Sequence, residues 1–266
     1  MTTSLIEEPD DVLDRLPVPH LSHSQINRYL TCPEQYRLYY VEKLRPRIQA
    51  AGMVFGALIH AALADFFRNG TDPASAFLRE WENLTGVDLR WGKRESWEDL
   101  KAKGEKLLRR FLAEEVPRIR EVYGVEKKFD LAVTTLILPF IGVVDLFAHV
   151  DGHTTIVDFK TSGVGYDGHE AALSDQLTAY ALAEPQAEKV ALCVFVKTKD
   201  PYVQWHFAER SPGDVADYLA KVGLILDDIA SGKFYKRPGK HCAYCDFLPV
   251  CLGDRQKVQE TLVRIT

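Results

Sequence analysis

The sequence has little of several features that would point to particular classes of protein. No apolar run reaches the length needed to cross a bilayer, and the first residues lack the basic start and apolar core of a secretion signal. Positive charge is not in excess, because 33 Lys and Arg stand against 38 Asp and Glu, a formal net charge of -5. We therefore expect a cytoplasmic protein with no membrane partner, in which any nucleic acid would bind a local basic patch.

Cysteine is also scarce, with five residues in the chain. An odd number without a secretion signal argues against a disulfide framework and for a metal or cluster site. Three of the five follow the spacing Cys242-x2-Cys245-x5-Cys251, the most specific metal signal in the sequence. Three thiolates are one short of a complete site, and both zinc and a four-iron four-sulfur cluster accept four cysteines. Cys193 lies in an apolar stretch, where we expect a core residue.

Length and composition are those of a globular protein. At 266 residues, with 46% hydrophobic and 27% charged side chains, the chain can form one sizeable core with an appended subdomain. Its patterns change from a Pro-containing acidic start through helical periodicity to strands rich in Val and Ile. We expect five segments: a flexible leader in 1–20, an N-terminal helical segment with Cys32 in 21–53, a helical region in 54–124, a core of sheet and helices in 125–235, and the cysteine segment in 236–266.

One predicted hairpin carries charge where a buried strand should not. Two runs rich in Val, Ile, Phe and Thr, Ile141 to Val150 and Thr155 to Thr161, are joined by Asp151-Gly152, the commonest signal for a two-residue turn. Asp145 interrupts the first run, and Asp158 with Lys160 interrupts the second. Because side chains alternate along a strand, Asp158 and Lys160 project from the same face.

If the hairpin brings Asp145 beside Asp158 and Lys160, two carboxylates and an ammonium meet in one place. Two close carboxylates repel unless a cation lies between them, and hard oxygen ligands suit Mg²⁺ or Mn²⁺. Such a site suits phosphodiester hydrolysis, in which the metal activates water and Lys160 steadies the nucleophile or the developing negative charge. The alternative is a buried Asp-Lys pair that only closes the sheet.

Further candidates lie on predicted helices. Val54 to Arg68 reads as an amphipathic helix in which Gly56 lies one turn before His60, leaving room for a backbone or ligand to approach. A lone His on an apolar helix is otherwise usually a core residue. Gln176 and Tyr180 are four apart and share one face of a later helix.

Two patterns typical of helix starts lie on either side of Cys32. Ser22-x-x-Gln25 is a capping-box pattern, and Pro33 in the first turn of a second helix would leave Cys32 at a helix N-terminus, which favours the thiolate. A second charged segment, the helix expected from about Trp97 to Arg120, is the most basic of the chain. It is either a solvated face or a strip for single-stranded DNA.

In order along the chain, these motifs resemble those of the PD-(D/E)XK nuclease superfamily. The likeness covers roughly Leu21 to Cys251 and is closest to the RecB/AddB-like branch, which includes the iron-sulfur exonucleases of CRISPR adaptation (Cas-type) and their phage-borne relatives. It rests on the cysteine box of Ser22 to Tyr36, Gly-x-x-x-His, Gly-x-x-Asp with Asp-x-Lys, Gln-x-x-x-Tyr and the cysteine trio. One departure is Asp158, where many relatives carry Glu.

The resemblance implies an α/β fold: a PD-(D/E)XK (restriction-endonuclease-like) core with a mixed central sheet flanked by helices, a helical insertion, and an iron-sulfur-stapled subdomain made from both ends of the chain. It implies that Cys32 joins Cys242, Cys245 and Cys251 in binding one [4Fe-4S] cluster, with zinc as the alternative. It also implies one or two Mg²⁺ or Mn²⁺ ions at the active site. Their ligands would be His60, Asp145, Asp158 and the backbone carbonyl of Phe159.

The same resemblance assigns the remaining roles. Lys160 would orient the attacking water, Gln176 and Tyr180 would position the DNA, and Glu126 would lie near the metals, although an exposed strand-edge Glu is an equal alternative. The implied function is a metal-dependent DNA exonuclease, acting on single-stranded DNA from an end with 5′ to 3′ polarity favoured, in recombination, repair or CRISPR adaptation, within a bacterial, archaeal or phage-infected cell. A recombination or adaptation protein could be its partner. The alternative is a catalytically silent DNA-binding or adaptor subunit that keeps an iron-sulfur or zinc site.

Overall fold

A computed structural model describes residues 16–93, 95–133 and 136–265. Most of the flexible leader expected in 1–20 lies outside these residues. The chain divides into two compact units, each assembled from separate stretches of the sequence. Unit 1 comprises Met1–Arg47, Asp130–Gly142 and Ala216–Thr266, and unit 2 comprises Ile48–Phe129 and Val143–Val215.

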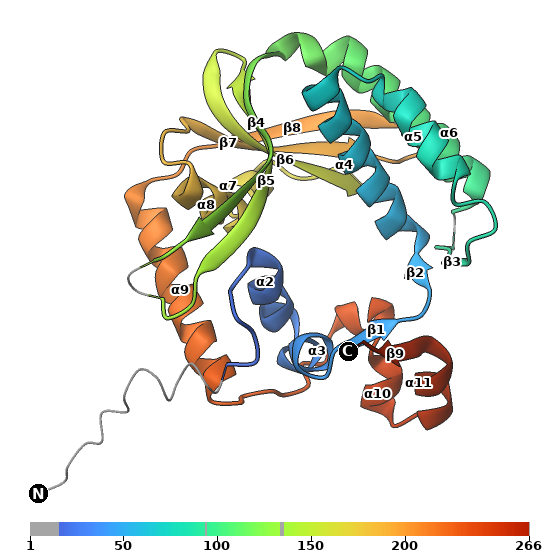
Figure 1. Cartoon of the computed structure of the whole chain (residues 1–266), viewed down its shortest axis with the longest axis vertical. Coiled ribbons are helices and arrows are strands. Elements are labelled where there is room, and N and C mark those ends of the chain that lie inside the picture. Colours follow the sequence, from blue (N-terminus) through green and yellow to red (C-terminus); the bar gives the residue numbers. More distant parts are fainter. Residues whose placement is uncertain (1–15, 94, 134–135, 266) are drawn as a thin grey trace, which may run out of the picture. The chain divides into compact units, whose positions relative to one another are not determined.

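Unit 2 is built around a five-stranded mixed sheet (Figure 1). Its strand order is β4 (Ile119–Leu131), β5 (Phe140–Val150), β6 (His153–Ser162), β7 (Lys189–Val196) and β8 (Tyr202–Ala208). The β5–β6 and β7–β8 pairs are antiparallel, whereas β6 and β7 are parallel. The predicted hairpin is confirmed: its turn residues Asp151 and Gly152 have φ angles of 48° and 89°, the left-handed conformation that a type I′ turn requires.

Helices cover both faces of this sheet, as expected for the fold class. On one face, α4 (Ala51–Asn69), α5 (Pro73–Glu82) and α6 (Trp97–Arg110) pack over side chains of alternate strand positions such as Val157 and Phe159. On the other face, α7 (His169–Ala172) and α8 (Asp175–Ala183) pack over Ile156 and its neighbours. A short parallel pair, β2 (Gln49–Ala50) and β3 (Leu89–Arg90), completes the unit. The alternation along β6 therefore divides the core into two layers.

Helix α4 corrects one expectation from the sequence. Its 19 residues are long and apolar enough to cross a membrane by length and composition. The helix nevertheless has the pattern of a core helix, because Phe55, Ile59 and Leu63 recur every four residues and are fully buried in the cluster beneath it. Burial of each such side chain contributes about 1.5–3 kcal/mol to stability. Core packing thus explains the buried stripe of α4, which is about a third of its apolar window.

Helix α6 tests the predicted basic strip. The five cations of this segment all have acidic partners: Lys101 pairs with Glu82, Lys103 with Asp99, Lys106 with Asp200, Arg109 with Glu105 and Arg110 with Glu114. Exposed pairs of this kind contribute little to stability, but they leave a surface of mixed charge. The structure favours the solvated-face interpretation of this helix.

Unit 1 contains the segments that carry four of the cysteines. Ser22 caps α2 (His23–Thr31) by accepting a hydrogen bond from the backbone of Gln25, as predicted. The unit continues through α3 (Pro33–Tyr36), a π-helical turn over Arg37–Val41, β1 (Leu44–Pro46), most of α9 (Pro212–Ala230), a 3₁₀ turn over Lys240–Tyr244, α10 (Leu248–Leu252), α11 (Arg255–Thr261) and β9 (Leu262–Arg264).

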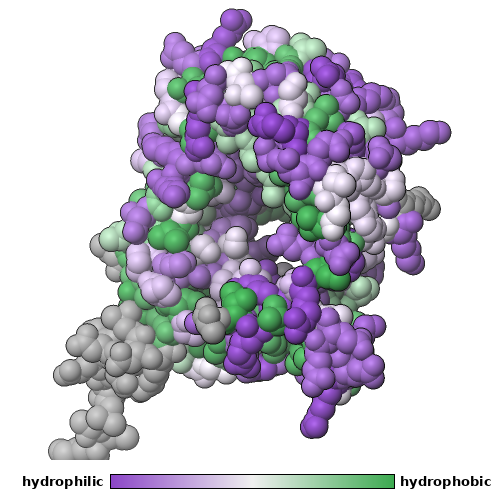
Figure 2. Space-filling view, turned by 45° about the vertical axis from the view of Figure 1, so that its right-hand side comes forward, coloured by the Kyte–Doolittle hydropathy of each residue, from purple (hydrophilic) through white to green (hydrophobic). Residues whose placement is uncertain are grey.

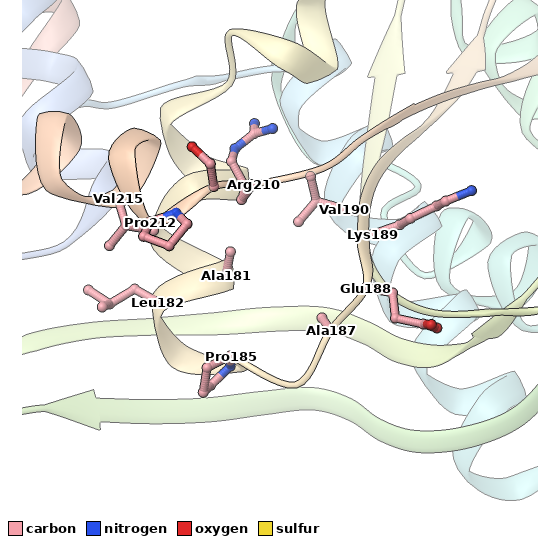
Figure 3. Close-up of a pocket in the computed structure, with 11 residues that line it drawn as sticks. Ala181, Leu182, Pro185, Ala187, Glu188, Lys189, Val190, Arg210, Pro212 and Val215 are labelled. Carbon is pink, nitrogen blue, oxygen red and sulfur yellow. The ribbon is translucent and has the colours of Figure 1, made fainter.

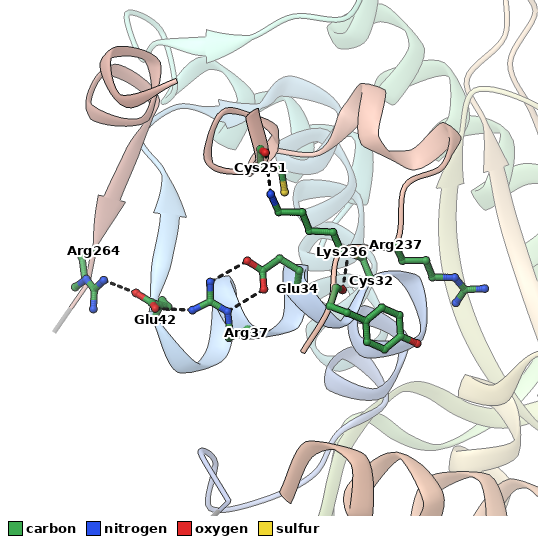
Figure 4. A network of polar contacts seen from close by, with 9 residues as sticks. Cys32, Glu34, Arg37, Glu42, Lys236, Arg237, Cys251 and Arg264 are labelled. Atoms are coloured by element: carbon green, nitrogen blue, oxygen red, sulfur yellow. Dashed lines mark hydrogen bonds and ion pairs between the residues drawn. The ribbon is translucent and has the colours of Figure 1, made fainter. Parts of the chain in front are cut away.

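Two segments that are distant in the sequence, residues 44–46 and 262–264, pair within unit 1. Strands β1 and β9 pair antiparallel, so that residues 44–46 lie beside residues 262–264. Arg37 bridges Glu34 and Glu42 at 2.8 and 2.6 Å, and Arg264 reaches the same Glu42 (Figure 4).

Figure 2 shows mostly hydrophilic residues on the face in view, with hydrophobic ones in small separate patches.

Candidate active site

His60 and Asp145 are brought together by a close approach of α4 to β6. A Cβ atom on Gly56 would lie 2.9 Å from Thr161 Oγ1, so a side chain at this position would push the helix away. One turn further along α4, His60 Nδ1 lies 3.4 Å from Asp145 Oδ2. Glycine at position 56 therefore permits the contact between histidine and carboxylate.

Asp145 and Asp158 lie where the β5–β6 hairpin opens. The paired register runs from Val150 opposite His153 to Leu146 opposite Val157, and the two aspartates are the next residues on their strands. Asp145 Oδ2 accepts a hydrogen bond of 2.8 Å from the backbone nitrogen of Phe159. Because the β5–β6 ladder ends here, the Phe159 nitrogen can donate to a side chain. This hydrogen bond holds the Asp145 carboxylate beside β6, the strand that carries Asp158.

Asp158 is almost completely buried, with 1% of the residue exposed. Its Oδ1 atom accepts a hydrogen bond of 2.9 Å from Gln176 Nε2. Its Oδ2 atom lies 2.6 Å from Lys160 Nζ, but no donor meets hydrogen-bond geometry at this oxygen. The contact with Lys160 is an ion pair, so Asp158 Oδ2 keeps a lone pair for a further ligand such as a cation.

Gln176 connects the remaining predicted residues. Its Oε1 atom accepts a 2.7 Å hydrogen bond from Lys160 Nζ, and its Nε2 atom donates to Tyr180 Oη at 2.7 Å as well as to Asp158. Helix α8 places Gln176 and Tyr180 on one face, as their spacing predicts. One amide thus holds the lysine and the aspartate of the Asp-x-Lys motif in fixed positions.

Burial and charge shift the pKa values of this group in consistent directions. Burial raises the pKa of Asp158 to about 6, with the Lys160 charge opposing and the Asp145 charge adding to the shift. Burial tends to lower the pKa of His60, but the hydrogen bond and charge of Asp145 outweigh it, so the pKa is raised. Burial and the charge of Asp158 raise the pKa of Tyr180. A buried carboxyl group with a raised pKa in a cluster of charged side chains, as at Asp158, is typical of catalytic and metal sites.

Two further predicted residues are Phe159, expected to act through its backbone carbonyl, and Glu126. The Phe159 side chain is buried in the core, where it stacks on Phe67 with 6.3 Å between ring centroids, so only its backbone is available to the site. Glu126 is exposed and pairs with Arg68 at 3.1 Å, and its φ angle of 44° is left-handed. Its observed contact is therefore with α4 at the surface, separate from the hydrogen-bonded group around Gln176.

The cysteine group lies within unit 1. Cys32, Cys242, Cys245 and Cys251 all line one cavity of about 290 Å³. Cys32 precedes α3 directly, as predicted, and its Sγ atom accepts a hydrogen bond from the backbone nitrogen of Arg237 at 3.5 Å. Figure 4 shows Lys236 reaching the backbone of Cys251, where Nζ donates to the carbonyl oxygen at 2.9 Å. The two ends of the chain thus supply the four thiols to one place.

Burial acts on the pKa values of two of these thiols. It raises the pKa of Cys245, opposed by hydrogen bonds from Phe247 and Gln35, and it raises the pKa of Cys251, opposed by the charge of Lys236. Over residues 16–265 as described, no three His, Cys, Asp or Glu side chains converge into a complete metal site. Cys193, by contrast, is fully buried in β7, as expected of a core residue.

A further cavity of unit 2, of about 310 Å³, shares no lining residue with either group (Figure 3). Charged residues Glu188, Lys189 and Arg210 help to line it. The guanidinium of Arg210 already donates to Thr178 Oγ1 and to the carbonyl oxygens of Ala171 and Ser174. These hydrogen bonds join α7 and α8 to the segment that follows β8. The arginine therefore has a structural role.

Comparison with known families decides the classification. The model of the family described as "PD-(D/E)XK nuclease superfamily" matches residues 20–252, most of the chain. The chain belongs to the PD-(D/E)XK nuclease superfamily. Asp145 and the Asp158-x-Lys160 motif fit the pattern of acidic residues and lysine that names this superfamily.

One solved structure agrees on the fold of this PD-(D/E)XK protein, and a second is a weaker match. A crystal structure of a protein from Eubacterium rectale, assigned as an exonuclease, superposes with a TM-score of 0.53 at 10% identity, covering 92% of each chain. The crystal structure of SSO0001 has a TM-score of 0.42 at 17% identity, covering 93% of this chain and 89% of that one. No curated protein sequence matches the chain.

Sequence reasoning missed two residues that support the catalytic and cysteine groups. Gln35, in the helical turn after Cys32, donates through Nε2 to Cys245 Sγ at 3.6 Å. Thr161 follows the Asp-x-Lys motif directly and contacts α4 at Gly56. The only signal in the sequence is proximity to a motif, since glutamine and threonine occur widely in helices and strands.

Proposed function

We propose that this PD-(D/E)XK protein is a metal-dependent DNA exonuclease that hydrolyses single-stranded DNA from an end, with 5′ to 3′ polarity favoured. Membership of the superfamily establishes the nuclease class. The observation that carries the proposal is the meeting of two carboxylates and an ammonium: Asp145 and Asp158 at the open end of the hairpin, with Lys160 2.6 Å from Asp158. The partner is DNA, and the branch we favour is RecB/AddB-like.

Mg²⁺ or Mn²⁺ suits the donor set of this group. Asp145, Asp158, His60 and the backbone carbonyl of Phe159 would hold the ion, and the buried Asp158 Oδ2 atom without an aligned donor supports this assignment. When bound, the metal would supply a more acidic water and offset negative charge on the phosphate. A cation would also relieve the repulsion between the two carboxylates.

The protein's own residues would act through position and charge. Lys160 would hold the attacking water or the developing negative charge, since its ammonium lies 2.6 Å from Asp158. Gln176 would keep Lys160 and Asp158 in fixed rotamers through its two hydrogen bonds. Tyr180 accepts from the same amide and so limits its rotation. This arrangement orients the reacting groups before substrate binds.

We also propose a [4Fe-4S] cluster at Cys32, Cys242, Cys245 and Cys251. All four thiols line one cavity, and the nearby Gln35 and Arg237 donors are of the kind that stabilise thiolate ligands. A cubane cluster is larger than a single ion and holds its cysteines around its outside, which suits thiols that line a cavity. Its role would be structural, joining the two ends of the chain.

The cofactor proposal has a direct test. Protein purified without air would show a broad visible absorption and contain about four iron and four sulfide per chain, the stoichiometry of a [4Fe-4S] cluster. Stoichiometric zinc without iron would reject the cluster and leave the same four cysteines as a zinc site.

The exonuclease proposal is tested by digesting single- and double-stranded DNA labelled at either the 5′ or the 3′ end. We expect early release of short labelled products from 5′-labelled single strands in Mg²⁺ or Mn²⁺, and none in EDTA. A circular single strand should resist. Cleavage of the circle would show an endonuclease, and binding without cleavage under every metal would favour a silent DNA-binding subunit.

A further inference from the structure

The loop after Lys160, residues 163–168, is held by side-chain contacts that the proposed catalytic group does not use. Gln204 on β8 makes two hydrogen bonds to the main chain of Tyr166: the Tyr166 nitrogen donates to Oε1 at 3.0 Å, and Nε2 donates to the Tyr166 carbonyl oxygen at 3.0 Å. A side-chain amide thus satisfies both backbone groups of one loop residue, as a neighbouring strand would. The loop is fixed at Tyr166.

The residue before Tyr166 permits this close contact. A Cβ atom on Gly165 would lie 2.7 Å from Tyr202 Oη and 3.2 Å from Gln204 Oε1, closer than ordinary packing allows. At the start of the loop, the Val164 nitrogen donates to Ser162 Oγ at 3.2 Å. Contacts at both ends therefore determine where the Tyr166 backbone lies and restrict the directions that its side chain can take.

The Tyr166 side chain is half-buried beside the catalytic group. Its ring packs against the core layer that contains Tyr180 and Leu177 from α8. The paired register sets Lys160 opposite Val194 and Val194 opposite Gln204, so these three residues form one row on this face of the sheet. Burial raises the pKa of the Tyr166 phenol, with the charge of Lys160 opposing the shift and those of Glu170 and Asp158 adding to it. Among the contacts of the described residues, none is a hydrogen bond from the Tyr166 hydroxyl to another protein group. A neutral phenol in this position can donate to an anionic substrate.

We infer that Tyr166 is a further substrate-contacting residue, which donates a hydrogen bond from its phenol to a non-bridging phosphate oxygen of the DNA strand, and that Gln204 is the positioning residue that sets it. The inference rests on the proposed function, since it takes a DNA strand as the occupant of the site. A phosphate oxygen is the expected acceptor because the cation of Lys160 lies close by, and ammonium and hydroxyl donors commonly bind phosphate together.

The test removes the hydroxyl and the phosphate oxygen separately and together. Binding of fluorescent single-stranded oligonucleotides, each with one methylphosphonate, is measured with the wild-type protein in EDTA, so that no strand is cut and Lys160 stays in place. Adding Tyr166→Phe should weaken binding of unmodified DNA about tenfold, the loss typical of a hydrogen bond to a charged group. The same substitution should have little effect on the one oligonucleotide whose methylphosphonate replaces the contacted oxygen.

Tyr123→Phe serves as the control, because this exposed tyrosine hydrogen-bonds only Glu121 among the described contacts. Equal affinity of the Tyr166→Phe and parent proteins for unmodified DNA would overturn the inference. So would the same loss for every methylphosphonate position. Because the assay reads binding, it separates this inference from the proposed function: a wild-type protein that cuts no DNA refutes the exonuclease and leaves the contact testable.

Gln204 is tested by two substitutions in an otherwise wild-type protein. Gln204→Leu removes both hydrogen bonds to the loop and should raise KM severalfold, whereas Gln204→Glu keeps an acceptor for the Tyr166 nitrogen and should recover part of the affinity. A purely structural role would lower thermal stability and leave KM unchanged. That result would reject Gln204 as a positioning residue.

Discussion

Gln176→Leu probes the hydrogen-bonded centre of the candidate active site. The substitution removes three contacts at once: acceptance from Lys160 at 2.7 Å, donation to Asp158 at 2.9 Å and donation to Tyr180 at 2.7 Å. Leucine has a similar size, so the cavity that it leaves is small. The largest loss falls on Asp158 Oδ1, because this carboxyl is 1% exposed and cannot turn to water for a replacement donor.

A buried acceptor that loses its partner costs about 1–3 kcal/mol. We therefore expect the free energy of unfolding of unit 2 to fall by about 2 kcal/mol in EDTA, measured by urea denaturation. The cleavage rate in Mg²⁺ should fall as well, because Lys160 and Asp158 lose their common support. Gln256→Leu is the control, since this exposed glutamine contacts only Glu260 among the described residues.

The result that would refute this reasoning is a Gln176→Leu protein as stable as the wild type and equally active. Gln176 would then fill space without orienting its neighbours. Loss of stability with an unchanged cleavage rate would reject only the catalytic part. The two readouts therefore separate the fold of the site from its chemistry.

Three further outcomes follow from the structure. Cys32→Ala should give colourless, poorly soluble protein without iron, measured by absorbance and metal analysis, whereas the core variant Cys193→Ala should keep its colour; a coloured Cys32→Ala protein would remove Cys32 from the site. Gly56→Ala should destabilise the protein by about 1–3 kcal/mol through overpacking against Thr161, and it should reduce cleavage. The double variant Gly56→Ala/Thr161→Ala should recover part of both. Equal stability of the wild type, the single variant and the double variant would contradict the close approach of α4 to Thr161. Asp145→Asn keeps an acceptor for the Phe159 nitrogen, so folding should persist while calorimetry shows weaker Mg²⁺ binding; unchanged binding would exclude Asp145 as a ligand.

The sequence predicted those parts of the site that depend on local periodicity. The Asp-Gly turn fixed the hairpin, and alternation along β6 placed Asp158 and Lys160 on one face. The spacing of Gln176 and Tyr180 placed both on one side of α8. The bridge from Gln176 to Lys160 and Asp158 could not be predicted, because it depends on how α8 packs on the sheet after a crossover connection.

Residues whose partners are distant in sequence were the hardest to predict. The cations of α6 gave a basic pattern, but their partners include Glu82 and Asp200, which only the folded chain brings near. Glu126 was placed near the metals by the resemblance alone, with an exposed strand-edge position as the alternative, and its left-handed backbone and its pair with Arg68 of α4 favour the exposed position. The two compact units combine stretches that are distant in sequence, because packing does not follow chain order.

The central claim is that Asp145, Asp158 and Lys160 form a phosphodiester-cleaving site. The most direct measurement compares the cleavage of labelled single-stranded DNA by wild-type protein and by Lys160→Ala, in Mg²⁺ and in EDTA, with Lys106→Ala as a control that removes an exposed lysine of α6. We expect the wild type and Lys106→Ala to cleave the DNA in Mg²⁺ but not in EDTA. Lys160→Ala should cleave at most a trace. Full activity of Lys160→Ala, or equal cleavage in EDTA, would contradict the central claim.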